Sequence, residues 1–294
     1  MMALFEGFER MQIEAGSGEI VNLVKGGSGP PLLLLHGYPQ THTMWHKIAP
    51  RLAEDFTVVC ADLRGYGDSG KPQGSADHFN HSKRAMAQDL VDAMSNLGFE
   101  TFFLGSHDRG ARCAHRLTKD HPERVLRLAT LDIVPTRHMF SIVDKEMATN
   151  TYHWFFLIQA YDFPERVIGA DPDYYIRSRF MRERNAEEVF PSEAVEEYVR
   201  CFSNPMAIHG ACEDYRAGAS IDLEHDEEDF DNKVNCPHLA LWSDRGFVGR
   251  TQDVLGVWRN YSNNVEGQSL PSGHYIAEEL PDDAYRLLHE FFTR

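Results

Sequence analysis

The stretch LGSHDRGAR, residues 104–112, follows directly after the run TFF at residues 101–103. Small residues, Ser106 and Gly110, stand two positions before and two positions after Asp108. A strand, a sharp turn between small residues and then a helix form a nucleophile elbow, which exposes the residue at its tip. The sequence therefore predicts that Asp108 occupies the nucleophile position, with a helix N-cap as the ordinary alternative for an aspartate there.

The type of residue at the tip of the elbow decides the chemistry. Serine or cysteine at this position performs acyl transfer. A carboxylate can instead displace a leaving group from an sp3 carbon and form an alkyl ester, which water then hydrolyses. Asp108 therefore shifts the expectation from esters toward carbon–halogen or epoxide bonds, and the helix that follows it favours its ionised form.

Strand and helix patterns alternate on both sides of the elbow. This alternation predicts an α/β fold with a mostly parallel sheet flanked by helices. The expected strands are residues 8–14, 20–25, 31–35, 56–61, 101–105, 125–131, 238–242 and 265–270, and the expected helices are residues 82–97, 110–121 and 282–292.

The alternation stops between about residues 135 and 232. That span has helical patterns only, at residues 141–150, 151–160, 191–202 and 209–217, and it is rich in aromatic residues. We expect a helical cap, residues 135–232, inserted after the sixth strand of a core formed by residues 1–134 and 233–294. An apolar cap suits a small-ligand pocket. The acidic run DEEDFD at residues 226–231 is expected to be a solvated linker back to the core.

Composition excludes several classes of partner. The net charge of −16 argues against nucleic acid, because phosphate binding needs a basic patch. No apolar run approaches the ~20 residues of a membrane helix, so no membrane is expected. The five cysteines form no C-x-x-C pair, which favours reduced thiols in a cytoplasm. A metal site at His225 and the acidic residues beside it is the alternative, but nothing there has a defined ligand spacing, so we expect no metal.

The motifs along the chain together resemble those of the α/β-hydrolase fold over nearly its whole length. They are residues 35–40 (LHGYPQ), 62–69 (DLRGYGDS), the elbow and 272–275 (SGHY). Within that fold the chain is similar to the haloacetate dehalogenases, in particular the fluoroacetate dehalogenases. The closer similarity lies in residues 107–112 (HDRGAR), Leu131-Asp132, His153-Trp154 and Tyr215.

The resemblance implies a catalytic set drawn from distant parts of the chain. His274 follows the last strand and would be the general base that activates water. The acid that orients His274 has two candidate positions. The usual position, after the seventh strand, falls at Gly246, which cannot serve, and Asp244 lies two residues earlier. We expect Asp132, at the end of the sixth strand, to be the acid, with Asp244 as the competitor.

Two arginines follow the nucleophile and suggest an anionic substrate. Arg109 and Arg112 are three residues apart on one helix and so share a face beside Asp108. Similar epoxide hydrolases and haloalkane dehalogenases carry tryptophan at the position of Arg109. Guanidinium groups bind carboxylates through paired hydrogen bonds. The prediction is that both arginines bind a substrate carboxylate, and surface ion pairing is the alternative.

The resemblance also implies a halide pocket and an oxyanion hole. His153, Trp154 and Tyr215 carry imidazole, indole and phenol donors that would converge on the leaving halide, with aromatic packing in the cap as the alternative. The backbone N–H groups of Tyr38 and Arg109 would form the oxyanion hole.

The function implied is hydrolysis of a small anionic haloacid, a haloacetate, to glycolate and halide through an aspartyl ester, with no metal and no organic cofactor. A homodimer is expected from the family alone. An epoxide hydrolase and a non-catalytic ligand receptor are the alternatives. The preference for fluoride or chloride, and the acceptance of 2-substituted haloacids, stay open at this point.

Overall fold

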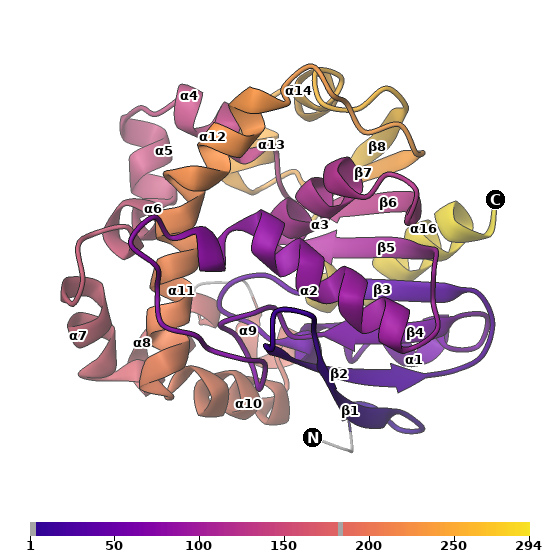
Figure 1. Cartoon of the computed structure of the whole chain (residues 1–294), viewed down its shortest axis with the longest axis horizontal. Coiled ribbons are helices and arrows are strands. Elements are labelled where there is room, and N and C mark those ends of the chain that lie inside the picture. Colours follow the sequence, from indigo (N-terminus) through magenta and orange to yellow (C-terminus); the bar gives the residue numbers. More distant parts are fainter. Residues whose placement is uncertain (1–3, 182–184) are drawn as a thin grey trace.

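A computed structural model describes residues 4–181 and 185–294. Its strands form one eight-stranded sheet in the order β1-β2-β4-β3-β5-β6-β7-β8 (Figure 1). The first two pairings, β1 with β2 and β2 with β4, are antiparallel, and all the others are parallel. The strands are β1 (Glu9–Glu14), β2 (Ile20–Gly26), β3 (Pro31–Leu35), β4 (Thr57–Ala61), β5 (Phe102–His107), β6 (Val125–Leu131), β7 (His238–Ser243) and β8 (Val265–Leu270).

The parallel part of the sheet is buried between helices. Residues 32–35 of β3 are all leucine and are at most 1% exposed, as expected for a strand covered on both faces. On one face α2 (Lys83–Asn96) packs beside α3 (Asp108–Asp120). The ring of Phe103 packs against Phe292 of α16 (Pro281–Thr293), with centroids 5.4 Å apart. The sheet and its helices confirm the predicted α/β class.

Shorter helices complete the core. They are the 3-10 turns η2 (His42–Trp45) and η3 (Phe79–His81), and the α-helices α1 (Ala49–Leu52), α13 (Phe247–Thr251), α14 (Val254–Trp258) and α15 (Ile276–Glu279).

Between β6 and β7 the chain leaves the sheet and forms a helical layer along one side of it (Figure 1). Its helices lie within the span predicted as a cap. They are α4 (Thr136–Ser141), α5 (Lys145–Asn150), α6 (Tyr152–Leu157), α7 (Phe163–Gly169), α8 (Pro172–Phe180), α9 (Ala186–Val189), α10 (Ser192–Phe202), α11 (Pro205–Gly218) and α12 (Ile221–Glu228).

The expectation of a solvated linker at residues 226–231 is wrong. Helix α12 extends through the first half of that run, and Asp226 is buried. Asp229 accepts hydrogen bonds from Arg116 and Lys119 of α3. Cations of the core helix thus hold the acidic run in place, a pairing across more than a hundred residues that a local charge pattern does not reveal.

The parallel sheet brings the predicted site residues to one edge. Tyr38 follows β3, Asp108 follows β5, Asp132 follows β6 and His274 follows β8. Strand β3 pairs with β4 on one side and with β5 on the other, so the direction of strand order changes there. The crevice outside the carboxyl ends at such a switch point is where open α/β sheets bind ligands.

Two features bear on the partners and surroundings of the chain. Within residues 4–181 and 185–294, no helix is long and apolar enough to cross a membrane. All five cysteines are free thiols.

Candidate active site

Asp108 stands at the turn between β5 and α3. Its φ of +43° lies in the left-handed region, which non-glycine residues rarely adopt. A Cβ on Gly110 would collide with the carbonyl oxygen of His36, and a Cβ on Gly37 would overlap that of Asp108. The two glycines therefore allow β3, its following loop and the start of α3 to approach closely enough to form the predicted strand–turn–helix elbow.

The Asp108 carboxylate is held ready as an anion. The backbone N–H of Tyr38 donates to its Oδ2 at 3.0 Å. The N–H of Arg109 lies in the first turn of α3, where amides have no partner inside the helix. Burial alone would raise the pKa of Asp108, but neighbouring imidazole and guanidinium groups, His274 foremost, outweigh it and lower that pKa to about 2.

His274 meets Asp132 beside the elbow. Its Nδ1 lies 2.6 Å from Asp132 Oδ2, so the imidazole N–H donates to the carboxylate. The backbone N–H of Ser243 donates to the other oxygen, Oδ1, at 2.8 Å. Asp132 is buried, and its two oxygens are thus both bonded. This arrangement fixes the orientation of the imidazole ring beside the elbow.

Asp244 lies elsewhere. Its half-exposed side chain is 3.8 Å from Arg245. A Cβ on Gly246 would lie 3.4 Å from Asp132 Oδ2, so the carboxylate of Asp132 occupies space beside the usual acid position. Of the two candidate acids, the structure brings Asp132 to His274. The assignment of catalytic roles to these residues stays a prediction.

A cavity of about 240 Å³ opens between the sheet edge and the cap. The core residues Asp108, Asp132 and His274 line the side formed by the sheet edge, and the cap residues His153 and Trp154 line the opposite side. The predicted nucleophile, the predicted base and two of the three predicted halide donors therefore face one space, although they come from segments up to 166 residues apart, the span from Asp108 to His274. The third predicted halide donor, Tyr215, does not line the cavity but packs behind His153 and Trp154.

Arg112 lines the same cavity. Its Nη1 donates to the carbonyl of Val134 and to Oγ1 of Thr136, both at 3.0 Å. The guanidinium stacks on the Trp154 ring, 4.6 Å from its centroid. Burial lowers the pKa of Arg112 to about 10, so the group stays charged at neutral pH. Neutral acceptors hold this arginine, which leaves its charge for an anion in the cavity.

Arg109 differs from Arg112. Its Nε and Nη2 form a fork with Asp214 of α11, at 2.9 and 2.7 Å. The guanidinium lies over the Tyr215 ring, 4.2 Å from the centroid, and does not line the cavity. Within the described part of the chain, Nη1 makes no hydrogen bond. That both arginines bind one substrate carboxylate stays a prediction. In it, Nη1 is the nitrogen of Arg109 that would bind, because Nε and Nη2 already bond Asp214.

The cap supplies buried donors that lack acceptors. Among the described residues, Tyr215 Oη and His153 Nδ1 are buried with no hydrogen-bond partner. Their rings are 5.7 Å apart, and that of Trp154 is 6.1 Å from Tyr215. Burial and the Asp108 carboxylate raise the pKa of Tyr215 well above its usual value, so the phenol keeps its proton.

His153 is also uncharged. Burial and the charge of Arg179 lower its pKa well below the ordinary range, so the imidazole is neutral at physiological pH and carries one N–H. Because buried polar groups almost always find partners, two unpartnered polar atoms side by side, the Tyr215 hydroxyl and His153 Nδ1, indicate a place for a bound polar group.

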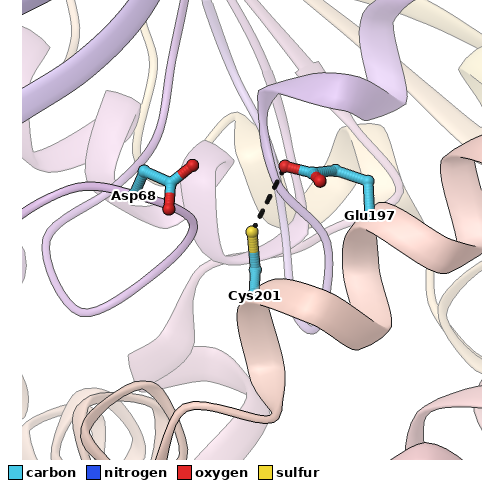
Figure 2. A group of neighbouring side chains, drawn as sticks. All are labelled: Asp68, Glu197 and Cys201. Atoms are coloured by element: carbon cyan, nitrogen blue, oxygen red, sulfur yellow. Dashed lines mark hydrogen bonds between the residues drawn. The ribbon is translucent and has the colours of Figure 1, made fainter. Parts of the chain in front are cut away.

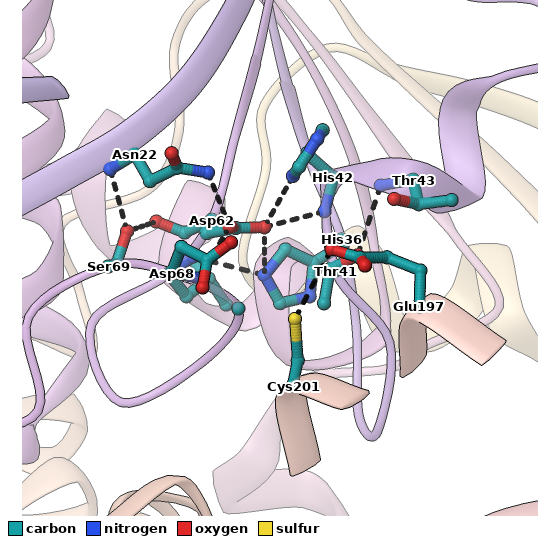
Figure 3. Close-up of polar contacts among 12 residues, drawn as sticks. Asn22, His36, Thr41, His42, Thr43, Asp62, Asp68, Ser69, Glu197 and Cys201 are labelled. Atoms are coloured by element: carbon teal, nitrogen blue, oxygen red, sulfur yellow. Dashed lines mark hydrogen bonds and ion pairs between the residues drawn. The ribbon is translucent and has the colours of Figure 1, made fainter. Parts of the chain in front are cut away.

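A buried network supports the loop that carries Tyr38 (Figure 3). Asp62 accepts hydrogen bonds from the Asn22 amide and from both the backbone and the ring of His42, each at 2.8 Å. Nε2 of His36 accepts from the backbone N–H of Leu63 at 3.0 Å. Burial opposes ionisation, yet His42 lowers the pKa of Asp62 below its usual range. The network fixes the position of the loop that carries Tyr38.

A second polar group lies away from the cavity. Asp68, Glu197 and Cys201 place potential ligand atoms within 4.8 Å of one another (Figure 2). Nη2 of Arg200 donates to Asp68 at 2.6 Å and to Glu197 at 2.7 Å, and Arg10 also donates to Asp68 at 2.6 Å. Since arginines already neutralise both carboxylates, the group is an ion-pair cluster rather than a set of metal ligands.

Sequence reasoning missed one charged residue of the cavity wall. Arg179, near the end of α8, lines the cavity. The sequence around it carries no motif, and only the packing of α8 over the sheet edge places it there.

Comparisons with known proteins show the family and the fold of this chain. A family model described as the α/β hydrolase fold matches residues 30–281. A fluoroacetate dehalogenase of a Burkholderia species is 48% identical over 291 residues, which cover 99% of this chain and 95% of that protein. A soluble epoxide hydrolase of Corynebacterium sp. strain C12 is 34% identical, over 94% of this chain and 95% of that protein. A crystal structure of an α/β hydrolase from Nostoc sp PCC 7120 superimposes with a TM-score of 0.97 at 54% identity, covering 99% of each chain.

Proposed function

The chain belongs to the α/β-hydrolase family and to its haloacetate dehalogenases, and we propose that it converts haloacetates, fluoroacetate among them, to glycolate and halide through an ester on Asp108. The observation that carries this proposal is the pair of unpartnered donors, Tyr215 Oη and His153 Nδ1, beside a cavity that also presents an ionised Asp108 and the charged Arg112.

In the first step the substrate carboxylate binds Arg112, with Arg109 Nη1 behind it, and the α-carbon faces Asp108. A carboxylate oxygen of Asp108 attacks this carbon while the carbon–halogen bond breaks, and the halide leaves with the bonding electrons. His153, Trp154 and Tyr215 donate hydrogen bonds to the halide as its charge develops. Donors fixed in advance stabilise such a charge without having to reorganise.

In the second step water hydrolyses the aspartyl ester. His274 removes a proton from the water, and Asp132 stabilises the imidazolium that forms. The backbone N–H of Tyr38, which already bonds Asp108 Oδ2, and that of Arg109 hold the oxyanion of the tetrahedral intermediate. Collapse of the intermediate releases glycolate and restores the Asp108 carboxylate.

Halide release from the purified protein tests this function directly. We expect fluoride from fluoroacetate and chloride from chloroacetate, with glycolate formed in equal amount. A parallel assay with neutral epoxides tests the main alternative, since an epoxide hydrolase is also a relative. Opening of neutral epoxides without halide release from either haloacetate would overturn the proposal. A neutral epoxide carries no carboxylate, so Arg112 would then have no role in binding the substrate.

Replacing Tyr215 by phenylalanine is expected to lower kcat/KM for fluoroacetate about 10- to 100-fold and that for chloroacetate much less. Fluoride is the poorer leaving group and depends more on each donor, and one hydrogen bond to a charged group contributes about 1.5–3 kcal/mol. The two rates are measured by halide release. The melting temperature is expected to be unchanged, because the hydroxyl has no partner within the described residues to lose.

Tyr174→Phe is the matched control, since Tyr174 lies in the same cap and is 71% exposed. It should leave both rates unchanged. An equal loss with both substrates in the Tyr215 variant would contradict a role in stabilising the halide.

A further inference from the structure

Arg179 enters the catalytic cavity from the cap, and the steps proposed above give it no role. It lies in the last turn of α8, a helix whose first turn is capped by Asp171 through a 3.0 Å bond to the Tyr174 N–H. The same cavity wall contains Tyr38 and Tyr275. The cavity therefore has two arginines, Arg112 from the core and Arg179 from the cap.

The guanidinium of Arg179 has no carboxylate partner among the described residues. Its Nη1 donates to Tyr152 Oη at 3.2 Å, and its Nε is buried without any partner. Tyrosine rings surround it, those of Tyr38 and Tyr152 lying 5.8 and 5.6 Å from its central carbon. Its Nη2 has no hydrogen-bond partner among the described residues, in a setting where a charge is costly unless it is paired.

A shortage of acidic residues does not explain why Arg179 has no carboxylate partner among the described residues. The chain has 45 acidic residues against 29 lysines and arginines. Two residues earlier on the same helix, Arg177 bonds Asp173 at 3.0 Å and Glu196 at 2.7 Å. Arg179 faces the cavity with no carboxylate partner among the described residues, whereas Arg177 of the same helix bonds two carboxylates, and this contrast indicates an anionic partner that arrives with the ligand.

The size of the cavity leaves room for such a partner. A haloacetate has one carboxylate, and in the proposed first step Arg112, which lines the cavity together with Asp108, binds it. The cavity of about 240 Å³ corresponds to roughly eight water volumes of ~30 Å³, more than a haloacetate fills. Arg179 lines this same cavity from the cap.

We infer that the site also accepts 2-halodicarboxylic acids, such as 2-chlorosuccinate, whose second carboxylate binds Arg179. This inference rests on the proposed function and extends its substrate class. Asp108 forms a bond to C2 while the C2–Cl bond breaks and chloride leaves with the electron pair. Water, deprotonated by His274, then cleaves the ester at its acyl C–O bond, and the proton passes to the departing alkoxide. The product is 2-hydroxysuccinate with inverted configuration at C2.

The test compares 2-chlorosuccinate with 2-chlorobutyrate, which has the same carbon chain but a methyl group in place of the second carboxylate. Each enantiomer is assayed by chloride release with the wild-type chain and with Arg179→Gln. We expect the wild type to prefer one enantiomer of 2-chlorosuccinate. We expect Arg179→Gln to lower the ratio of kcat/KM for 2-chlorosuccinate to that for 2-chlorobutyrate about 10- to 100-fold.

Arg177→Gln is the matched control, since it removes an arginine from the same helix whose partners are Asp173 and Glu196 on the surface. It should leave the ratio unchanged. Calorimetric titration of 2-chlorosuccinate into the Asp108→Asn protein, with and without Arg179→Gln, measures the same preference without turnover.

Chloroacetate separates failure of this inference from failure of the function. If chloroacetate is dehalogenated but 2-chlorosuccinate is not, the substrate class is wrong and the haloacetate function stands. Arg179→Gln could instead lower kcat/KM equally for 2-chlorosuccinate, 2-chlorobutyrate and chloroacetate. Arg179 would then attract any anionic substrate rather than bind a second carboxylate, and the inference would be overturned. If no substrate releases halide, both proposals fail.

Discussion

Replacing Asp108 by asparagine is expected to reduce halide release from chloroacetate and fluoroacetate by at least roughly ten-thousand-fold. The amide cannot displace halide from carbon, and no other carboxylate shares this place in the elbow. Asparagine is the suitable substitute because the residue has a φ of +43°, a conformation that asparagine tolerates better than most residues. Its side-chain oxygen can still accept the N–H of Tyr38.

The Asp108→Asn protein should otherwise behave as the wild type. Arg112 and the cap are untouched, so chloroacetate should still bind, which calorimetry can measure. The melting temperature should remain close to that of the wild type, and an intact-mass measurement verifies that the asparagine has not reverted to aspartate. Halide release above about one per cent of the wild-type rate would show that Asp108 is not the nucleophile.

Replacing His274 by asparagine is expected to stop the reaction after one halide per active site. The first step does not need the base, whereas hydrolysis of the ester does. The protein should gain the mass of a carboxymethyl group on the peptide containing Asp108, detectable by mass spectrometry after proteolysis. Steady-state turnover should fall by at least about a thousand-fold, since general base catalysis contributes about 10²–10⁴-fold.

Asp244→Asn is the control for this experiment. Asp244 is half exposed and is not among the residues that line the cavity, so its replacement should leave turnover intact and no ester should accumulate. Continued turnover by the His274→Asn protein would contradict the two-step scheme. Accumulation of ester in the Asp244 variant would show that the contact between His274 and Asp132 is not the catalytic one.

The fold could be predicted because its signals are local. Two of these signals, the leucine run of β3 and the small residues around the elbow, each lie within a few consecutive residues. The alternation of strands and helices is the sum of such short patterns along the chain. Because buried parallel strands read as continuous apolar runs, their approximate bounds follow from the sequence. The resemblance to haloacetate dehalogenases, carried by HDRGAR and His153-Trp154, is confirmed by the comparisons with known proteins.

The contacts of individual side chains were harder to predict. Helical spacing puts Arg109 and Arg112 on one face, yet the first pairs with Asp214, 105 residues away, while the second lines the cavity. The acidic run at residues 226–231 looks solvated in sequence, but Arg116 and Lys119 bind it. In each case the deciding partner belongs to an element that only the folded chain brings near.

By itself, the sequence determined the α/β class, the aspartate at the elbow and a limited list of candidate residues, because short-range patterns encode strands, turns and helices. Tertiary structure alone decided that Asp132 rather than Asp244 meets His274, that Arg109 is engaged by Asp214, and that Arg179 lines the cavity with no carboxylate partner among the described residues. The physical reason is that hydrogen bonds and ion pairs depend on separations of about 3 Å. Such separations between distant segments are set by how the cap packs on the sheet edge, and no local pattern records that packing.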